Sequence, residues 1–178
     1  MAIKFFIVIF ALWLSNILFV SIHEMGHGIM TAAFGGKICN IYVNPLGLDG
    51  SITHTVIPDA LGANIVLSAG LGITTLALMV FYYLKLDLFV YVMAIRTIEC
   101  AINLNPGSDM YTLMNSIGSN AFVIMALIVV INAYFAGQAF YNRCNTIERD
   151  IFDDRAKDMV KPALFLSIFL TPLISIKR

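Results

Sequence analysis

Long apolar runs dominate the pattern of hydrophobic and polar positions along the chain. In the first run, residues 5–22, 18 consecutive residues carry no charge, and the helical pattern continues to about Phe34. Gly35 and Gly36 should end this helix. Since about 20 apolar residues span a bilayer, we predict a first transmembrane helix over residues 5–34. A signal peptide is the alternative, but no small-residue cleavage site closes the run.

The next segment, residues 37–58, has a different pattern. Short stretches of alternating apolar and polar residues lie on both sides of Asp49 and Gly50. This arrangement favours a β-hairpin with a turn near Asp49-Gly50. Extended backbone is tolerated at membrane depth only where protein buries it or water reaches it. We therefore expect the hairpin to lie at the membrane interface or to line a cavity.

Further apolar runs predict three more membrane spans, at about 60–84, 88–104 and 119–140. Pro106, between Asn105 and Gly107, should break the third helix, and a short helix should resume at Asp109. The expected fold is an all-α polytopic membrane protein with about four to five transmembrane helices and a short β-hairpin after the first helix.

The C-terminal part of the chain differs from the rest in its charge. We expect a membrane-embedded core over residues 1–140, followed by a second region over residues 141–178. The charged, amphipathic segment 141–161 should lie at the membrane surface. The short apolar run 162–176 is either a fifth span or an interfacial helix, and the sequence leaves both open.

Composition strengthens the membrane assignment and excludes some partners. Hydrophobic residues make up 60% of the chain and charged residues 12%, against about 45–50% and about 25% in soluble domains. We expect a multi-pass integral protein of the cell membrane. Basic and acidic residues are equal in number and no basic cluster occurs, so we expect no nucleic-acid partner. The loops show no clear excess of positive charge, which leaves orientation open, and the oligomeric state is equally open.

Cysteine spacing gives no sign of a disulfide framework or of a cysteine metal site. Cys39, Cys100 and Cys144 are isolated and odd in number, and they form no CxxC pair. We interpret them as ordinary buried thiols.

The candidate chemistry is concentrated at the end of the first apolar run. His23 and His27 are four positions apart, which places both rings on one face of a helix. Two neutral imidazoles so placed can share one zinc ion. Zinc lowers the pKa of bound water to about 7, and the neighbouring Glu24 could accept the proton. A polar patch at a helix end is the alternative, but ionisable residues inside a span are costly and usually functional.

A catalytic zinc site needs a third protein ligand. The side chains that could supply it are Asp109, Glu99, His54, Asp49 and Asp59. Glu99 lies three residues after Arg96, so an ion pair within one helix explains it. Asp49 precedes glycine in the predicted turn, and Asp59 could cap the second span.

Asp109 and His54 remain as candidates for the third ligand. Asp109 follows the predicted helix break, which would give its carboxylate access to a site between helices. Its alternative role is to cap the helix after the break. For His54, a position at the interface or facing a cavity explains the residue as well as metal binding does.

Three motifs occur in order along the chain: F-V-S-I-H-E-M-G-H-G at 19–28 with F-G-G-K after it, N-P-L-G at 44–47 with S-A-G-L-G at 68–72, and N-L-N-P-G-S-D at 103–109. Through these motifs the chain resembles the site-2 protease family of intramembrane zinc metalloproteases. The resemblance covers residues of about 5–118. It departs from the family at Leu71, where the family has proline, and at Met110, where it has glycine.

The resemblance implies a metal site and a reaction. His23, His27 and Asp109 would bind one Zn2+ ion, and Glu24 would be the general base. Asn103 would hydrogen-bond the substrate or the developing oxyanion. The family cuts membrane-spanning helices, so the implied partners are transmembrane protein substrates within the lipid bilayer. The implied core has three helices, at about 5–34, 60–84 and 88–118.

The expected function is therefore intramembrane peptide hydrolysis by a zinc metalloendopeptidase. The substrate helix would unwind and extend along residues 37–57 by strand addition. One alternative is an inactive relative that binds membrane helices without cutting them. Another is a zinc transporter or metal-binding membrane protein, although an ion path needs ligands at several depths, often with inverted repeats. The sequence has one such cluster and no repeat.

Overall fold

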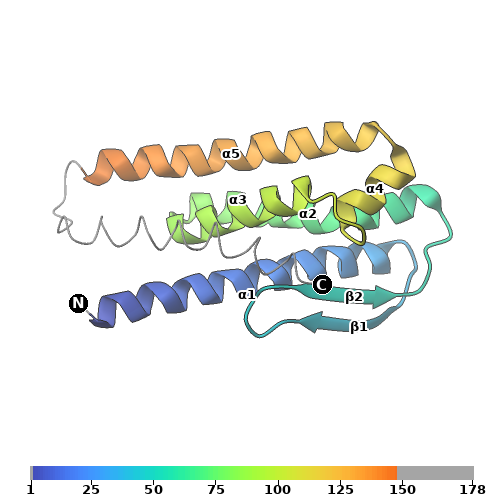
Figure 1. The fold of residues 1–178 in the computed structure, drawn as a ribbon, viewed down its shortest axis with the longest axis horizontal. Coiled ribbons are helices and arrows are strands. Elements are labelled where there is room, and N and C mark those ends of the chain that lie inside the picture. The colour runs from blue at the N-terminus through green and yellow to red at the C-terminus, as the bar shows by residue number, and fades with distance from the viewer. Residues whose placement is uncertain (1, 148–178) are drawn as a thin grey trace. The chain divides into compact units, whose positions relative to one another are not determined.

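The computed structural model describes residues 2–147 of the protein, with side chains from 5 to 143 (Figure 1). Its elements are, in order, α1 (Ala2–Ala33), β1 (Ile38–Val43), β2 (Gly50–His54), α2 (Ala60–Tyr83), α3 (Asp87–Ile102), α4 (Asp109–Ile117) and α5 (Asn120–Ile147). The chain divides into two compact units, Met1–Ala139 and Phe140–Arg178. The first unit contains both strands, α1 to α4 and most of α5.

The first two predicted helices are confirmed, and their ends follow the expected capping rules. Beyond the last turn of α1, Gly35 has a φ of +75°, and the Gly36 N–H donates to the Thr31 carbonyl at 2.9 Å. Glycine is favoured there because a side chain would be strained in that conformation. At the start of α2, the Asp59 carboxylate accepts a hydrogen bond from the Gly62 N–H at 2.7 Å, as predicted.

Three described helices, α1, α2 and α5, are long and apolar enough to cross a membrane, which indicates a membrane protein. Within the described residues, these are fewer candidate spans than predicted. The helix predicted at 88–104 is confirmed as α3, but it is not among the helices long enough to cross a membrane. It has 16 residues and a length of about 24 Å, shorter than the hydrocarbon core of about 30 Å. The predicted span at 119–140 corresponds to α5. The run at 162–176 and most of the charged segment 141–161 lie outside the described residues.

The predicted hairpin is confirmed, with its turn slightly earlier than expected. β1 and β2 are antiparallel, with Val43 opposite Gly50. The connecting loop covers residues 44–49, and its first residue, Asn44, donates its N–H to the Asp49 carbonyl at 2.9 Å. The Asn44 side chain accepts the Leu46 N–H at 2.8 Å, a common way for asparagine to stabilise a turn.

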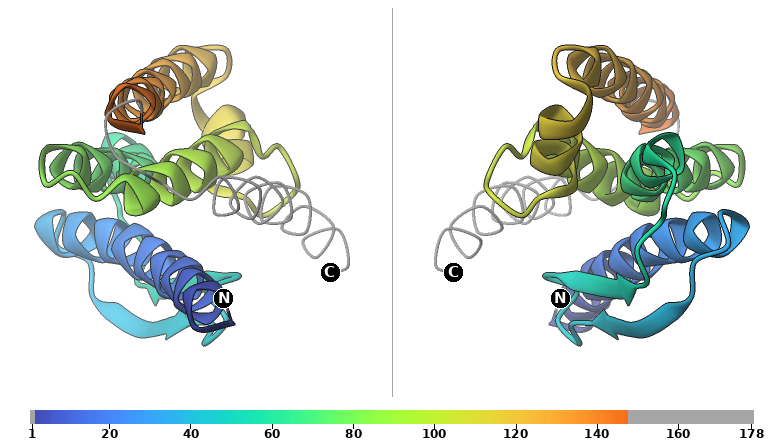
Figure 2. Two further views of the ribbon diagram at one scale, coloured as in Figure 1. Left: turned by 90° about the vertical axis from the view of Figure 1, so that its left-hand side faces the viewer. Right: turned by 90° about the vertical axis from the view of Figure 1, so that its right-hand side faces the viewer.

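Helix α1 lies between the hairpin and the other helices of the first unit. Figure 2 shows the two strands on one side of α1 and the pair α2 and α3 on the other. The close approach of α1 to α2 depends on Gly26, where a Cβ atom would lie 2.6 Å from the Ala69 carbonyl oxygen. Small residues at helix interfaces allow such contacts in membrane proteins.

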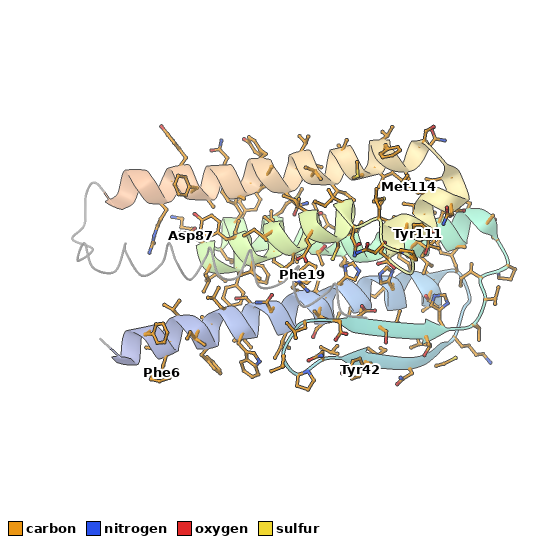
Figure 3. All side chains as sticks on the ribbon, in the orientation of Figure 1. Phe6, Phe19, Tyr42, Asp87, Tyr111 and Met114 are labelled. Atoms are coloured by element: carbon orange, nitrogen blue, oxygen red, sulfur yellow. The ribbon has the colours of Figure 1, made fainter. Side chains whose placement is uncertain are left out.

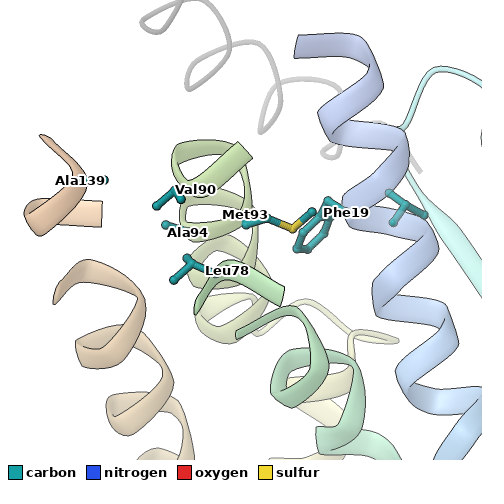
Figure 4. Close-up of a cluster of buried hydrophobic side chains, with 7 residues drawn as sticks. Phe19, Leu78, Val90, Met93, Ala94 and Ala139 are labelled. Atoms are coloured by element: carbon teal, nitrogen blue, oxygen red, sulfur yellow. The ribbon is translucent and has the colours of Figure 1, made fainter. Parts of the chain in front are cut away.

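A cluster of buried apolar side chains joins α1, α2, α3 and α5 within the first unit. Figure 4 shows Phe19 of α1 facing Met93 of α3, with Leu78 of α2 and Ala139 of α5 in the same cluster. Met93 and Leu78 are fully buried. This packing fixes α3 against the face of α1 that continues toward the histidines.

A polar contact also joins α5 to α2. The Asn132 side-chain amide donates to the Thr75 hydroxyl at 2.9 Å and to the Ile128 carbonyl at 2.8 Å. Both Asn132 and Thr75 are buried. Hydrogen bonds between helices in a membrane are worth about 0.6 kcal/mol on average and up to about 1.7 kcal/mol.

We predict that Thr75→Val lowers the free energy of unfolding in detergent by about 0.6 to 1.7 kcal/mol, because Asn132 loses its partner on α2. The matched control is Thr74→Val. Thr74 is also buried, but its hydroxyl bonds only to carbonyls of its own helix, those of Gly70 and Leu71. Equal destabilisation by the two substitutions would contradict a role for the contact between helices.

Candidate metal centre

The structure brings together the three residues that the resemblance implied as metal ligands. His23 and His27 come from α1 and Asp109 from the start of α4, and this is the one group of three or more possible metal ligands among the described residues. The Asp109 Oδ2 atom lies 3.0 Å from the Nε2 atom of each histidine. The two Nε2 atoms lie 3.1 Å apart.

These distances fit a single metal ion. Zinc bonds of about 2.0–2.2 Å to histidine nitrogen and carboxylate oxygen imply donor atoms about 3.3 Å apart in a tetrahedral site. The observed separations of 3.0 to 3.1 Å come within a few tenths of an ångström of that value. The three ligand atoms converge from two helices, and a tetrahedral metal ion would have one further position beyond these three.

The two histidine rings have different surroundings on the side away from Asp109. The His27 Nδ1 atom lies 2.7 Å from the Val66 carbonyl on α2. An N–H at Nδ1 can donate to this carbonyl, which leaves Nε2 as the free ligand atom. The His23 ring packs on Phe19 with centroids 5.8 Å apart, and the buried His23 Nδ1 has no hydrogen-bond partner in the described part of the chain.

A helix break positions Asp109, and the residue does not cap α4. The N-cap is Ser108, whose hydroxyl accepts the Tyr111 N–H at 3.2 Å. The predicted role of Asp109 as the N-cap is therefore wrong, because the Ser108 side chain already accepts a hydrogen bond from an N–H of the first turn. Gly107, with a φ of +92°, completes the reversal of the chain. Asp109 begins the new helix with its carboxylate directed at the histidines.

Asn103 belongs to the same break. It ends α3, its side-chain oxygen accepts the Asn105 N–H at 3.1 Å, and its carbonyl accepts the Ser108 hydroxyl at 2.7 Å. These bonds shape the segment that carries Asp109. Contact of Asn103 with a substrate stays a prediction.

The remaining candidates for a third ligand lie outside the group. Glu99 accepts a hydrogen bond from Arg96 at 2.9 Å, which confirms the predicted pair. Asp59 caps α2, and Asp49 lies in the hairpin loop. His54 is exposed at the end of β2, where its Nδ1 atom lies 2.8 Å from the Thr55 carbonyl.

Glu24 is buried beside the metal ligands. Its carboxyl group lies close enough to His23, His27 and Asp109 to interact with each electrostatically. The first residue of β2 packs against it, since a Cβ atom on Gly50 would lie 3.1 Å from the Glu24 Oε1 atom. The hairpin thus covers the side of the site on which Glu24 lies.

Gly70 is a site residue that sequence reasoning missed. A Cβ atom at this position would lie 2.5 Å from the His27 Nε2 atom and 2.6 Å from the His23 Nε2 atom. The absence of a side chain therefore makes room for both rings. The run of small residues at 68–72 indicated close helix packing, but not contact with the histidines.

No protein-family model, curated protein or solved structure matches the chain. The resemblance to site-2 proteases therefore rests on the motifs of this sequence. The residue group that the structure forms from two of those motifs shows that a metal ion could be held, whichever family the chain belongs to.

We predict that the purified protein binds one Zn2+ ion, and that His23→Ala or Asp109→Ala removes a direct ligand. Each substitution should weaken zinc binding by more than the roughly 10- to 100-fold that loss of an outer-shell partner costs. Metal content and competition with a chelator measure this effect. His54→Ala is the control and should bind as the wild type does. Equal affinity of His23→Ala and His54→Ala would contradict the site.

Gly70 gives a separate prediction that changes no ligand. Gly70→Ala should also weaken zinc binding, by about tenfold or more, because its methyl group would displace the two rings. Gly72→Ala is the matched control on the same helix, since a Cβ atom there meets nothing within 4 Å. Chelator competition on both variants tests the prediction, and an unchanged affinity in Gly70→Ala would show that the rings can move without loss.

Proposed function

We propose that the protein is an intramembrane zinc metalloendopeptidase that hydrolyses peptide bonds in transmembrane segments of membrane proteins. The single observation that carries this proposal is the convergence of His23, His27 and Asp109 to within 3.1 Å, with Glu24 beside them. His23, Glu24 and His27 all lie within Phe5–Ala33, an apolar helix long enough to cross a membrane.

The donor set supports zinc as the metal. Two imidazoles and one carboxylate suit zinc, whereas calcium and magnesium prefer oxygen ligands throughout. A zinc ion held by these residues would supply Lewis-acid activation of the substrate carbonyl and of water. Gly70 leaves room for the Nε2 atoms of both rings, which would hold the ion.

In the proposed reaction, Glu24 is the general base. Its carboxylate accepts a proton from the attacking water and then delivers that proton to the leaving amine. Burial of Glu24 under Gly50 keeps bulk water away from this transfer. Asn103, six residues before Asp109, is proposed to donate its side-chain amide to the substrate or to the developing oxyanion.

The proposed substrates are membrane-spanning protein segments, because the site lies within an apolar helix. A peptide bond in a helix is shielded and hydrogen-bonded, so the substrate must unwind before it is cut. The hairpin offers extended backbone along which an unwound segment could add as a strand. Ile38, Ile41 and Tyr42 of β1 expose apolar side chains that suit such a partner. We also propose that the protein is a multi-pass protein of the cell membrane.

Experiments could instead support one of two other functions. A zinc transporter needs ligands at several depths, and the described residues hold one group. An inactive relative would bind zinc and membrane helices without cleavage, which an assay separates from an active enzyme.

We predict that Glu24→Gln retains zinc and lowers the rate of cleavage of a single-span substrate by about 100- to 10,000-fold, the usual contribution of a general base. Rates measured on purified protein with equal zinc content test this. Asp59→Asn is a matched control that also neutralises a carboxylate, since asparagine is an equally good N-cap for α2. Cleavage by Glu24→Gln at the wild-type rate would refute the mechanism.

A further inference from the structure

Arg96 is a buried cation that the proposed reaction does not use. Its exposed fraction is 8%. One guanidinium nitrogen donates to the Glu99 carboxylate and another to the Leu48 carbonyl, both at 2.9 Å. The guanidinium carbon lies 5.4 Å from the centre of the Phe19 ring. This one side chain on α3 therefore contacts α1, the hairpin loop and its own helix.

The ion pair with Glu99 does not by itself account for this position. A pair within one helix forms equally well on an exposed face, and burial of a charge is costly unless several bonds compensate it. Burial lets the guanidinium reach the Leu48 carbonyl, 48 positions away in sequence. Glu99 and the Phe19 ring then hold the guanidinium in the orientation that this bond needs.

The loop that Arg96 holds leads directly to the metal centre. It covers residues 44–49, and the next residue, Gly50, packs against Glu24 and Val20 of α1. At the other side of Leu48, Gly47 lies against the α1 backbone, since a Cβ atom there would be 2.6 Å from the Ile17 nitrogen. The loop is thus held between α1 and the Arg96 guanidinium.

A second set of contacts connects Arg96 to the ligands. Phe19, beneath the guanidinium, also packs on the His23 ring. Figure 3 shows Phe19 between α1 and α3, and Figure 4 shows it facing Met93, which lies one helical turn before Arg96. Cys100, one turn after Arg96, packs against the buried cluster that contains Met110, the residue after Asp109. Arg96 is therefore close to the site without belonging to its ligand group.

We propose that Arg96 is a positioning residue that clamps the hairpin loop onto α3 and thereby keeps the start of β2 closed over Glu24. Trp13 of α1 also holds this loop, since its indole N–H donates to the Pro45 carbonyl at 2.9 Å. Breaking the bond to the Leu48 carbonyl releases the loop from α3, so that the start of β2 can move off Glu24 and open a path to the metal centre. If this path also admits substrate, that consequence rests on the proposed protease function. The clamp itself does not, because loop opening and metal release are measured without cleavage.

The test compares Arg96→Met, Arg96→Lys and Lys85→Met in the full-length protein in detergent. Amide hydrogen exchange of the peptide that covers residues 44–50 should be about 10- to 100-fold faster in Arg96→Met, since a hydrogen bond from a charged donor is lost. Arg96→Lys can still donate one bond and should restore most of the protection. Lys85→Met, which removes an exposed cation in the turn between α2 and α3, should match the wild type.

Metal release gives the second measurement. Loss of bound Zn2+ to an excess of chelator should be about tenfold faster in Arg96→Met than in Lys85→Met and largely restored in Arg96→Lys. Wild-type exchange of the loop in Arg96→Met would overturn the clamp. Fast exchange with unchanged metal release would overturn its control of the site.

Two further outcomes separate this inference from the proposed function. If Arg96→Met does not fold, Glu99→Gln decides the matter. That variant keeps the bond to Leu48 but loses the carboxylate that orients the guanidinium, so it should increase loop exchange by a smaller factor, and wild-type exchange would again overturn the clamp. If the wild type cleaves no substrate while the exchange results hold, the clamp stands and the protease function fails.

Discussion

The structure depends on one constraint: three side-chain atoms that can bind a metal ion must meet between apolar helices. The Nε2 atoms of His23 and His27 and a carboxylate oxygen of Asp109 lie 3.0 to 3.1 Å from one another. Unpaired polar groups are costly when buried, and more so where lipid rather than water surrounds the protein. The Val66 carbonyl supplies a partner for the outer nitrogen of His27, and Gly70 has no side chain that would keep the two rings apart.

Helix α1 and the start of α4 position their ligands in different ways. On α1, regular helix geometry brings the histidines onto one face, and glycines at Gly26 and Gly70 allow α2 to approach closely enough for the Val66 carbonyl to reach His27. Asp109, in contrast, is positioned by an interruption of helical structure. The break between α3 and α4 turns the chain at Gly107 and lets Ser108 cap the new helix, so that the Asp109 carboxylate remains available.

Local patterns in the sequence predicted much of this arrangement. The length of α1, the Asp59 cap, the hairpin and the pair of Arg96 and Glu99 each depend on residues a few positions apart. The pairing of the histidines followed from helix periodicity, whereas Asp109 as the third ligand followed from the resemblance. Contacts between distant segments that no motif of the resemblance includes were missed, because no periodicity encodes them. The approach of Gly70 to the histidines and the bond from Arg96 to Leu48 are of this kind.

The two sides of the site are held in unequal ways. The ligand side consists of helices packed through glycines and a buried apolar cluster, so its movement would require the separation of whole helices. The side above Glu24 is a short loop and the start of a two-stranded hairpin, fixed to α3 by the Arg96 side chain. Elements with few buried contacts open at lower free energy than the core. The proposed enzyme would have to admit an unwound membrane helix, and for this it needs metal ligands that stay fixed and a cover that moves. In this chain those requirements are separated, because the ligands lie on packed helices and the cover on the hairpin.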